Sequence, residues 1–103
     1  MAILDPRLRL AIDLALAPNG NAAWTDAWEA EGRKLGMTGA EIDAARQGRG
    51  FDVQTSRALA LALACRAGDA RYILCRRQAL RAGLPAPVCR EIERLALRHD
   101  EED

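Results

Sequence analysis

Residues Asn21–Ile42, NAAWTDAWEAEGRKLGMTGAEI, decide the fold of this chain. Trp24 and Trp28 stand one helical turn apart, which predicts an amphipathic helix. Gly36 supplies the left-handed residue that commonly closes a helix. The sequence TGAE at 38–41 is a capping box, in which the threonine and glutamate side chains satisfy each other's free backbone N–H groups. This stretch therefore predicts two helices joined by a tight turn.

Similar start and stop signals occur along the rest of the chain. Alanine and leucine at helical spacing fill the intervals, and β-branched and aromatic residues are few. We therefore expect an all-α fold of about six helices in antiparallel hairpins. The expected helices are 6–17; from the Asn21 cap to Gly36; from Thr38 to Gly48; 53–67 with Asp52 as its cap; from the Asp69 cap to Gly83; and a last helix after the turn at 84–87.

The length of 103 residues is that of one domain with a single core. We expect a helical domain over residues 1–98 and a frayed acidic tail over residues 99–103. The stretch 53–67 is apolar nearly all round, which is typical of a helix buried in a subunit interface. No apolar run is long enough to cross a bilayer and no leader-like start is visible, so we expect a cytoplasmic protein with no membrane partner.

Charge is balanced overall but unevenly placed. Fifteen Lys and Arg residues offset fifteen Asp and Glu residues, yet residues 1–52 carry −2, residues 53–90 carry +6 and residues 91–103 carry −4. This balance gives no reason to expect nucleic acid as an obligate partner. We interpret the arginines of the middle segment as solvated helix faces. An anion-binding patch at Arg71, Arg76 and Arg77 is the alternative.

Two helical hairpins in the chain resemble each other. The tripeptides at 35–37 (LGM) and 82–84 (AGL) each follow a basic, alanine-containing helix and precede a capped helix with Glu-Ile. Their spacing, close to 47 residues, indicates an internal duplication. Ordinary capping rules also produce short helix-glycine-helix units, and this alternative stays open.

Few residues could carry catalysis. The motifs of zinc proteases, P-loop proteins, dinucleotide-binding proteins and serine hydrolases are absent, and we expect no metal and no cofactor. His99, the sole histidine, stands in the charged tail, where a solvated role is expected. Cys65, Cys75 and Cys89 suggest neither a zinc site nor a disulfide framework. Cys75 is the catalytic candidate, because the neighbouring arginines would favour its thiolate.

The order of these signals resembles the carboxymuconolactone decarboxylase and AhpD-like family of helical proteins. The specific part lies in Ala30–Ile42, where GMTGAEI is similar to the family's G-[LM]-[ST]-x-x-E-I, and weaker matches cover residues 5–67. In redox-active members the preceding helix carries C-x-x-C-x-x-x-H, and Asn21, Trp24 and Trp28 stand at the matching positions here. The resemblance therefore implies an AhpD-like helical bundle that lacks the family's thiols and histidine.

By this resemblance Trp24 and Trp28 would line the place of the family's site, with Asn21 and Glu29 beside them. Large aromatic residues on an amphipathic helix usually provide buried area. We therefore favour core or subunit-interface packing for both tryptophans. An aromatic pocket with Glu29 or an arginine at its rim is the alternative.

Three functions remain in competition. We favour an AhpD-like helical protein without thiol-redox catalysis that acts as an oligomeric binding or assembly module, and the resemblance implies a trimer or hexamer. The second is a decarboxylase-like or peroxidase-like enzyme with a substituted site that uses Cys75. The third and weakest is a helix-turn-helix DNA-binding protein, because the helix over residues 87–103 is acidic on balance. None of the three names a small-molecule ligand.

Overall fold

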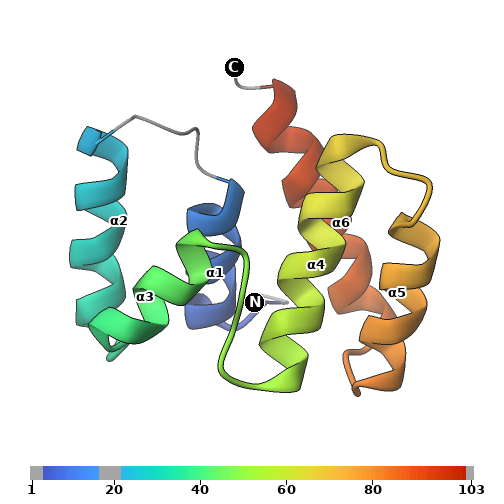
Figure 1. The fold of residues 1–103 in the computed structure, drawn as a ribbon, viewed down its shortest axis with the longest axis horizontal. Helices are drawn as coiled ribbons and strands as arrows, with labels where there is room; N and C mark the ends of the chain where they lie inside the picture. The colour runs from blue at the N-terminus through green and yellow to red at the C-terminus, as the bar shows by residue number, and fades with distance from the viewer. Residues whose placement is uncertain (1–3, 17–21, 102–103) are drawn as a thin grey trace.

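The computed structural model describes the backbone of residues 4–16 and 22–101 and the side chains of residues 4–16 and 26–98. Over these residues the chain forms six helices and no strand, which confirms the expected all-α fold. The helices are α1 (Pro6–Leu16), α2 (Ala22–Lys34), α3 (Gly39–Arg46), α4 (Val53–Ala67), α5 (Tyr72–Arg81) and α6 (Ala86–Glu101). In Figure 1, α1, α2 and α3 make up one half of the molecule, and α4, α5 and α6 make up the other.

The predicted capping side chains are in place at two helix starts. At α3, Thr38 accepts the N–H of Glu41 at 3.1 Å, and the Glu41 carboxylate accepts the N–H of Thr38 at 3.1 Å. At α4, the Asp52 carboxylate accepts the N–H of Thr55 at 3.0 Å. These bonds satisfy backbone donors that have no partner inside the helix. The local sequence therefore sets where both helices begin.

Helices α5 and α6 differ from the prediction at their ends. Helix α5 begins at Tyr72 and not at Asp69, whose carboxylate accepts the backbone N–H and the guanidinium of Arg71 and closes a turn ahead of the helix. Helix α6 already begins at Ala86, because Pro87 in the first turn needs no intrahelical N–H partner. Helix α6 also runs to Glu101, so the expected acidic tail starts as helix. Residue 17, the expected end of the first helix, lies outside the described residues.

Helix α4 forms the centre of the bundle. It packs against α1, α5 and α6, and α1 packs in turn against α2, α3 and α6. The side chains that α4 buries completely are Ala58, Leu59, Leu61 and Ala62. One face of α4 thus serves the core of this domain, while Ala60, Leu63 and Ala64 stay half-exposed, and the expected subunit interface at this helix stays a prediction. No helix among the described residues has the length and apolar character needed to span a membrane.

The two halves repeat each other at an offset of 47 residues. We call residues 5–46 the first repeat and residues 52–93 the second repeat. Equivalent helices begin at Pro6 and Val53 and at Gly39 and Ala86, and the helices between them end at Lys34 and Arg81. The agreement of these bounds along both halves supports the duplication and goes beyond what glycine capping alone requires.

Each repeat contains a side-chain hydrogen bond at the same position. The Nε of Arg7 donates to the carbonyl of Leu35 at 2.7 Å, and 47 positions later the Nε2 of Gln54 donates to the carbonyl of Ala82 at 3.0 Å. Each bond ties the first helix of a repeat to the turn between its second and third helices. In both turns the next residue is a glycine with positive φ, 88° in the first repeat and 105° in the second. A side chain there would be strained and would collide with the donating group.

An ion pair also recurs, with its charges exchanged. In the first repeat Glu29 of α2 lies 3.1 Å from Arg46 of α3. At the equivalent positions of the second repeat Arg76 of α5 lies 3.2 Å from Glu93 of α6. Both pairs join the second helix of a repeat to its third. Both repeats therefore place opposite charges at these positions, with the orientation of the pair reversed between them.

Candidate functional site

The residues that the family resemblance assigns to a site lie on α2. Trp28 is half-buried and packs against the hydrophobic core. Glu29 is paired with Arg46 of α3 and so links two helices of the first repeat. Asn21 and the side chain of Trp24 lie outside the described residues. The two candidate side chains that the structure describes, Trp28 and Glu29, thus have a role in packing or in helix–helix attachment.

The three arginines of the predicted anion patch have separate surroundings. Arg71 donates two hydrogen bonds to the Asp69 carboxylate, at 3.1 and 2.8 Å, and these bonds lower the pKa of Asp69. Arg76 is paired with Glu93 across α5 and α6. Arg77 is exposed to solvent. Two of the three guanidinium groups are therefore already matched by carboxylates of this chain, which leaves less of their charge for an external anion.

All three cysteines belong to the second repeat and are free thiols. Burial raises the pKa of the Cys65 thiol, and the Glu93 carboxylate raises it further. Burial is also the largest cause of the raised pKa of Cys89, with Glu93 adding to it and Arg76 opposing it. A raised pKa reduces the fraction of reactive thiolate at neutral pH. Cys65 and Cys89 therefore have the properties of structural cysteines.

Cys75, the catalytic candidate, is half-buried beside a groove between α4 and α5. The groove has a volume of about 480 Å³. Its walls are mostly apolar and small, and they are formed by Ala60, Leu63, Ala64 and Ala67 of α4 and by Leu74 and Cys75 of α5. Polar residues, among them Arg71 and Gln78, lie at its edge. Such a surface can hold an apolar group, but among its lining residues there is neither a histidine nor an amine to activate the thiol.

A second cavity lies where the two repeats meet. Its volume is about 310 Å³, at the small end of the range for small-molecule sites. Residues at equivalent positions of the two repeats line it in pairs: Asp5 and Asp52, Arg7 and Gln54, Leu8 and Thr55, and Met37 and Leu84. The cavity thus lies beside the first turns of α1 and α4, which begin at equivalent positions of the two repeats.

The charged groups of this cavity are largely used by the fold. The Asp5 carboxylate accepts the N–H groups of Arg7 and Leu8, and Asp52 and Glu41 cap α4 and α3. Hydrogen bonds from the hydroxyl and the N–H of Thr55 lower the pKa of Asp52, so this carboxylate is anionic at neutral pH. The mixture of acidic, basic and apolar groups marks no single class of ligand.

Helix α6 presents a more basic surface than its composition indicates. Glu93 is paired with Arg76, and Glu91 lies 3.6 Å from Arg94. Both glutamates are partly buried, whereas the exposed residues of the helix include Arg90, Arg94 and Arg98. The acidic balance that counts against the DNA-binding hypothesis therefore comes largely from residues 100–103.

Sequence reasoning did not predict the cavity between the repeats, the groove or the exposed residue Phe51. The signal for the cavity was present, since an offset of 47 residues brings Asp5 and Asp52 to equivalent helix starts.

Within the described part of the chain, no group of three or more His, Cys, Asp or Glu side chains could hold a metal ion. No family model matches the chain, and neither a curated protein nor a solved structure shows significant similarity to it.

Proposed function

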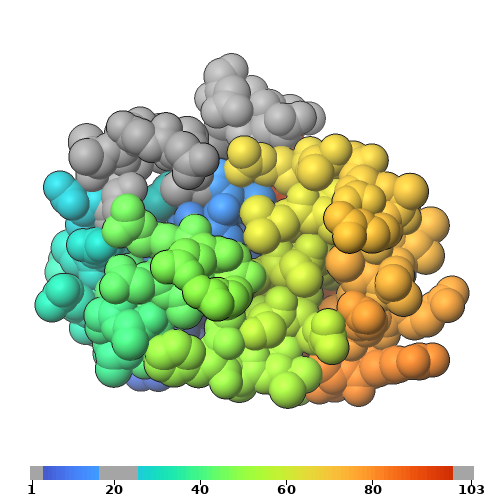
Figure 2. All heavy atoms as spheres, in the orientation of Figure 1, coloured from blue at the N-terminus to red at the C-terminus, as the bar shows by residue number. Residues whose placement is uncertain are grey.

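We propose that this protein is a self-associating helical assembly module, built on an AhpD-like scaffold and without thiol-redox catalysis. The apolar surface of α5 carries this proposal. Ile73, Leu74 and Leu80 are exposed by 57%, 49% and 42% of their surface, and Tyr72 by 37%. Large apolar side chains that gather on one helix in this way are typical of protein–protein contacts. Figure 2 shows α5 at one edge of the molecule, where a partner has access to it.

The first repeat indicates that the fold does not require this apolar surface. The positions equivalent to Tyr72, Ile73, Leu74 and Leu80 hold Thr25, Asp26, Ala27 and Arg33 on α2. The same three-helix arrangement therefore forms with polar or small residues there. The exposed part of these isoleucine and leucine side chains is not needed by the three-helix arrangement and risks aggregation, so contact with a partner is its most direct explanation.

The candidate catalytic residues give no comparable support to an enzyme. Asn21, Trp24 and Trp28 cannot exchange a disulfide or act as the family's histidine. Cys75, the catalytic candidate, has neither a histidine nor an amine among the residues that line its groove. The trimer or hexamer implied by the resemblance is the form of assembly that we expect, and the compartment that we expect is the cytoplasm.

Sedimentation velocity from 2 to 200 µM tests the proposal. The informative variant carries the first repeat's own residues, Ile73→Asp, Leu74→Ala and Leu80→Arg. We expect the native chain to sediment as an oligomer of the 11.2 kDa protomer and the variant as a monomer with the same helical circular dichroism. A matched control, Leu97→Ser on α6, removes an equally exposed leucine from another surface and should leave the oligomer intact.

A native chain that stays monomeric over the whole concentration range would refute self-association. An oligomer that the triple variant leaves unchanged would show that α5 is not the contact surface. Turnover of a hydroperoxide with a dithiol reductant, lost on Cys75→Ser, would instead support the enzyme hypothesis.

A further inference from the structure

The exposed side of α6 carries a row of arginines. The exposed side chains described on this helix are Pro87, Arg90, Arg94, Leu97 and Arg98, and none of them is acidic. The arginines follow one another at intervals of four residues, so they lie on one side of the helix, about 6 Å apart along its axis. We call Arg90, Arg94 and Arg98 the basic strip, which is about 12 Å long.

The charge of the basic strip is mostly available to a partner. No carboxylate among the described side chains is paired with Arg90 or Arg98. Arg94 lies 3.6 Å from Glu91, which is longer than a hydrogen bond, and its side chain is 69% exposed. Glu93, the other glutamate in the described part of this helix, forms its ion pair with α5. The strip therefore keeps most of its positive charge at the surface.

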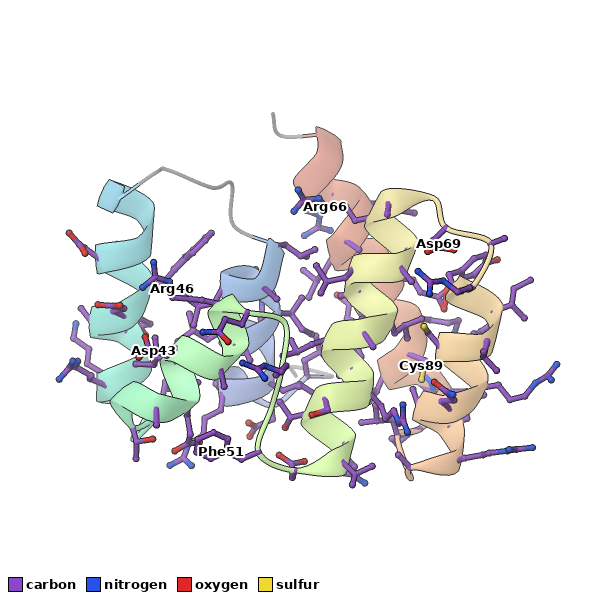
Figure 3. The ribbon with its side chains drawn as sticks, in the orientation of Figure 1. Asp43, Arg46, Phe51, Arg66, Asp69 and Cys89 are labelled. Atoms are coloured by element: carbon purple, nitrogen blue, oxygen red, sulfur yellow. The ribbon has the colours of Figure 1, made fainter. Side chains whose placement is uncertain are left out.

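The fold itself does not require these arginines. Asp43 of α3, which Figure 3 labels, stands at the position equivalent to Arg90. Helix α3 ends after 8 residues whereas α6 runs for 16, so the turns of α6 beyond residue 93 have no counterpart in the first repeat. The inner side of these added turns is anchored in the core by Leu95 and Ala96, which are 3% and 0% exposed. Packing thus explains the inner side of the added turns but gives no role to their basic outer side.

The kind of charge favours phosphate as the group that the strip binds. Every basic residue of the chain except Lys34 and the single histidine is an arginine. The planar guanidinium donates two parallel hydrogen bonds to phosphate oxygens, which a lysine ammonium cannot do. Leu97 is the only large apolar side chain exposed on the described part of α6, so the strip lacks the apolar face with which helices bind a lipid surface. A nucleic acid presents phosphates in a regular row and needs no such face.

The arrangement of the helices fits duplex DNA. Helices α5 and α6 are joined by residues 82–85, and Gly83 in this turn has a φ of 105°. Two helices joined by a short turn with a glycine are the unit from which DNA-binding proteins place the second helix in the major groove. That groove is about 12 Å wide, close to the diameter of an α-helix with its side chains, whereas the major groove of duplex RNA is too narrow. The second helix of the unit is α6, which carries the basic strip.

We infer that the protein binds duplex DNA through α6, with Arg90, Arg94 and Arg98 contacting phosphates while the helix lies along the major groove. This contact goes beyond the self-association proposed above, because it uses none of the apolar residues of α5. The four acidic residues at 100–103 follow the strip directly in the sequence. Like charges interact over a Debye length of about 8–10 Å, so these carboxylates oppose the binding of DNA. Removing the arginines and removing the carboxylates should therefore have opposite effects.

Fluorescence anisotropy with a labelled DNA duplex of about 20 base pairs tests the inference. Each phosphate that is neutralised contributes about −0.9 to the slope of log affinity against log salt concentration, so three arginines give about −2.7. We expect the native chain to bind with a Kd of about 1–10 µM at 50 mM NaCl and about 40-fold more weakly at 200 mM. The triple variant Arg90→Gln, Arg94→Gln and Arg98→Gln should bind at least tenfold more weakly at 50 mM and lose most of the salt dependence.

Two further variants show whether the effect belongs to this surface. The matched control Arg9→Gln, Arg33→Gln and Lys34→Gln removes three exposed cations from α1 and α2 and changes the net charge equally. This control should bind DNA within threefold of the native chain. Replacing the four carboxylates at 100–103 by the corresponding amides should strengthen binding at least threefold at 50 mM NaCl. If the triple variant does not fold by circular dichroism, Arg90→Gln alone should reduce the salt slope by about 0.9.

Three results would overturn the inference. The first is a native chain that does not bind the duplex at 100 µM protein in 50 mM NaCl. The second is a matched control that weakens binding as much as the triple variant, which would mean that the net charge acts and not the strip. The third is equally tight binding of poly-glutamate, which would assign the strip to acidic proteins. Sedimentation measures self-association independently, so the proposed function can fail or stand apart from DNA binding.

Discussion

The ion pair between Arg76 and Glu93 gives the sharpest test of the repeated architecture. Arg76 Nε and Glu93 Oε1 are 3.2 Å apart, and both atoms are shielded from solvent without any hydrogen bond. Glu93→Gln removes the carboxylate and leaves the Nε of Arg76 buried opposite a neutral group. Loss of one partner from a fully buried pair typically costs about 3–5 kcal/mol.

The cost here should be smaller, because 37% of the Arg76 side chain is exposed and its terminal nitrogens can turn to water. We expect Glu93→Gln to lower the free energy of unfolding by about 1–2 kcal/mol. For a domain of this size each kcal/mol corresponds to a fall in Tm of about 4–8 °C. Urea denaturation followed by circular dichroism, together with thermal melting, measures both quantities.

The first repeat supplies the matched comparison. Its equivalent pair is more exposed, at 45% for Arg46 and 29% for Glu29, so Glu29→Gln should cost only about 0.5 kcal/mol or less. The exchanged pair Arg76→Glu with Glu93→Arg adopts the orientation used in the first repeat. Each single charge reversal creates two like charges and should destabilise, whereas the double variant should recover most of that loss.

Two results would refute this reasoning. The first is a cost for Glu93→Gln no greater than that for Glu29→Gln, which would mean that shielding of the second pair has no energetic effect. The second is a double variant whose destabilisation equals the sum of its two single variants, which would mean that the two positions do not interact.

Two further predictions concern titration and thiol reactivity. The folded-state pKa of Asp52 is lowered from its ordinary value of 3.8, so the carboxylate stabilises the fold above pH 3.8 and loses this effect as the pH falls through the folded-state pKa. The difference in free energy of unfolding between the native chain and Asp52→Asn should therefore shrink in the acid range. Urea denaturation from pH 7 to pH 2 measures this difference, and a constant difference would contradict the prediction. Cys65 and Cys89 should react with iodoacetamide at pH 7.5 more slowly than cysteine in a short peptide, because burial raises the pKa of both thiols and limits access to them. Mass spectrometry of the labelled chain measures the alkylation rates. Alkylation of Cys89 at the rate of the peptide would disprove the prediction.

Much of the fold could be predicted from local signals. The capping box at 38–41 and the Asp52 cap act within one helical turn, so residue types at fixed spacing were sufficient to place them. The prediction failed at Asp69, where an aspartate suited to capping binds the guanidinium of Arg71 and closes a turn instead. Two competing local bonds of similar strength cannot be ranked from sequence alone.

The candidate site could be predicted much less well. Trp28 and Cys75 were both singled out, and the offset of 47 residues makes their positions equivalent. Only the structure shows that one packs against the core while the other borders a groove. The apolar stretch 53–67 suggested an interface helix. The structure buries one face of that helix at the centre, leaves its other face along an open groove, and exposes Ile73, Leu74 and Leu80 of α5.

The sequence by itself determined the six helices and the caps at Thr38 and Asp52, because these depend on contacts between residues close along the chain. It indicated the internal repetition, which the helix bounds then supported. Which apolar faces are covered was decided only in the tertiary structure. Burial depends on how α1, α4 and α6 pack against one another across long chain separations, and helical spacing is the same for a face that meets the core and a face that meets a partner. For that reason the groove beside Cys75 and the exposed Phe51 could be recognised only after the bundle was assembled.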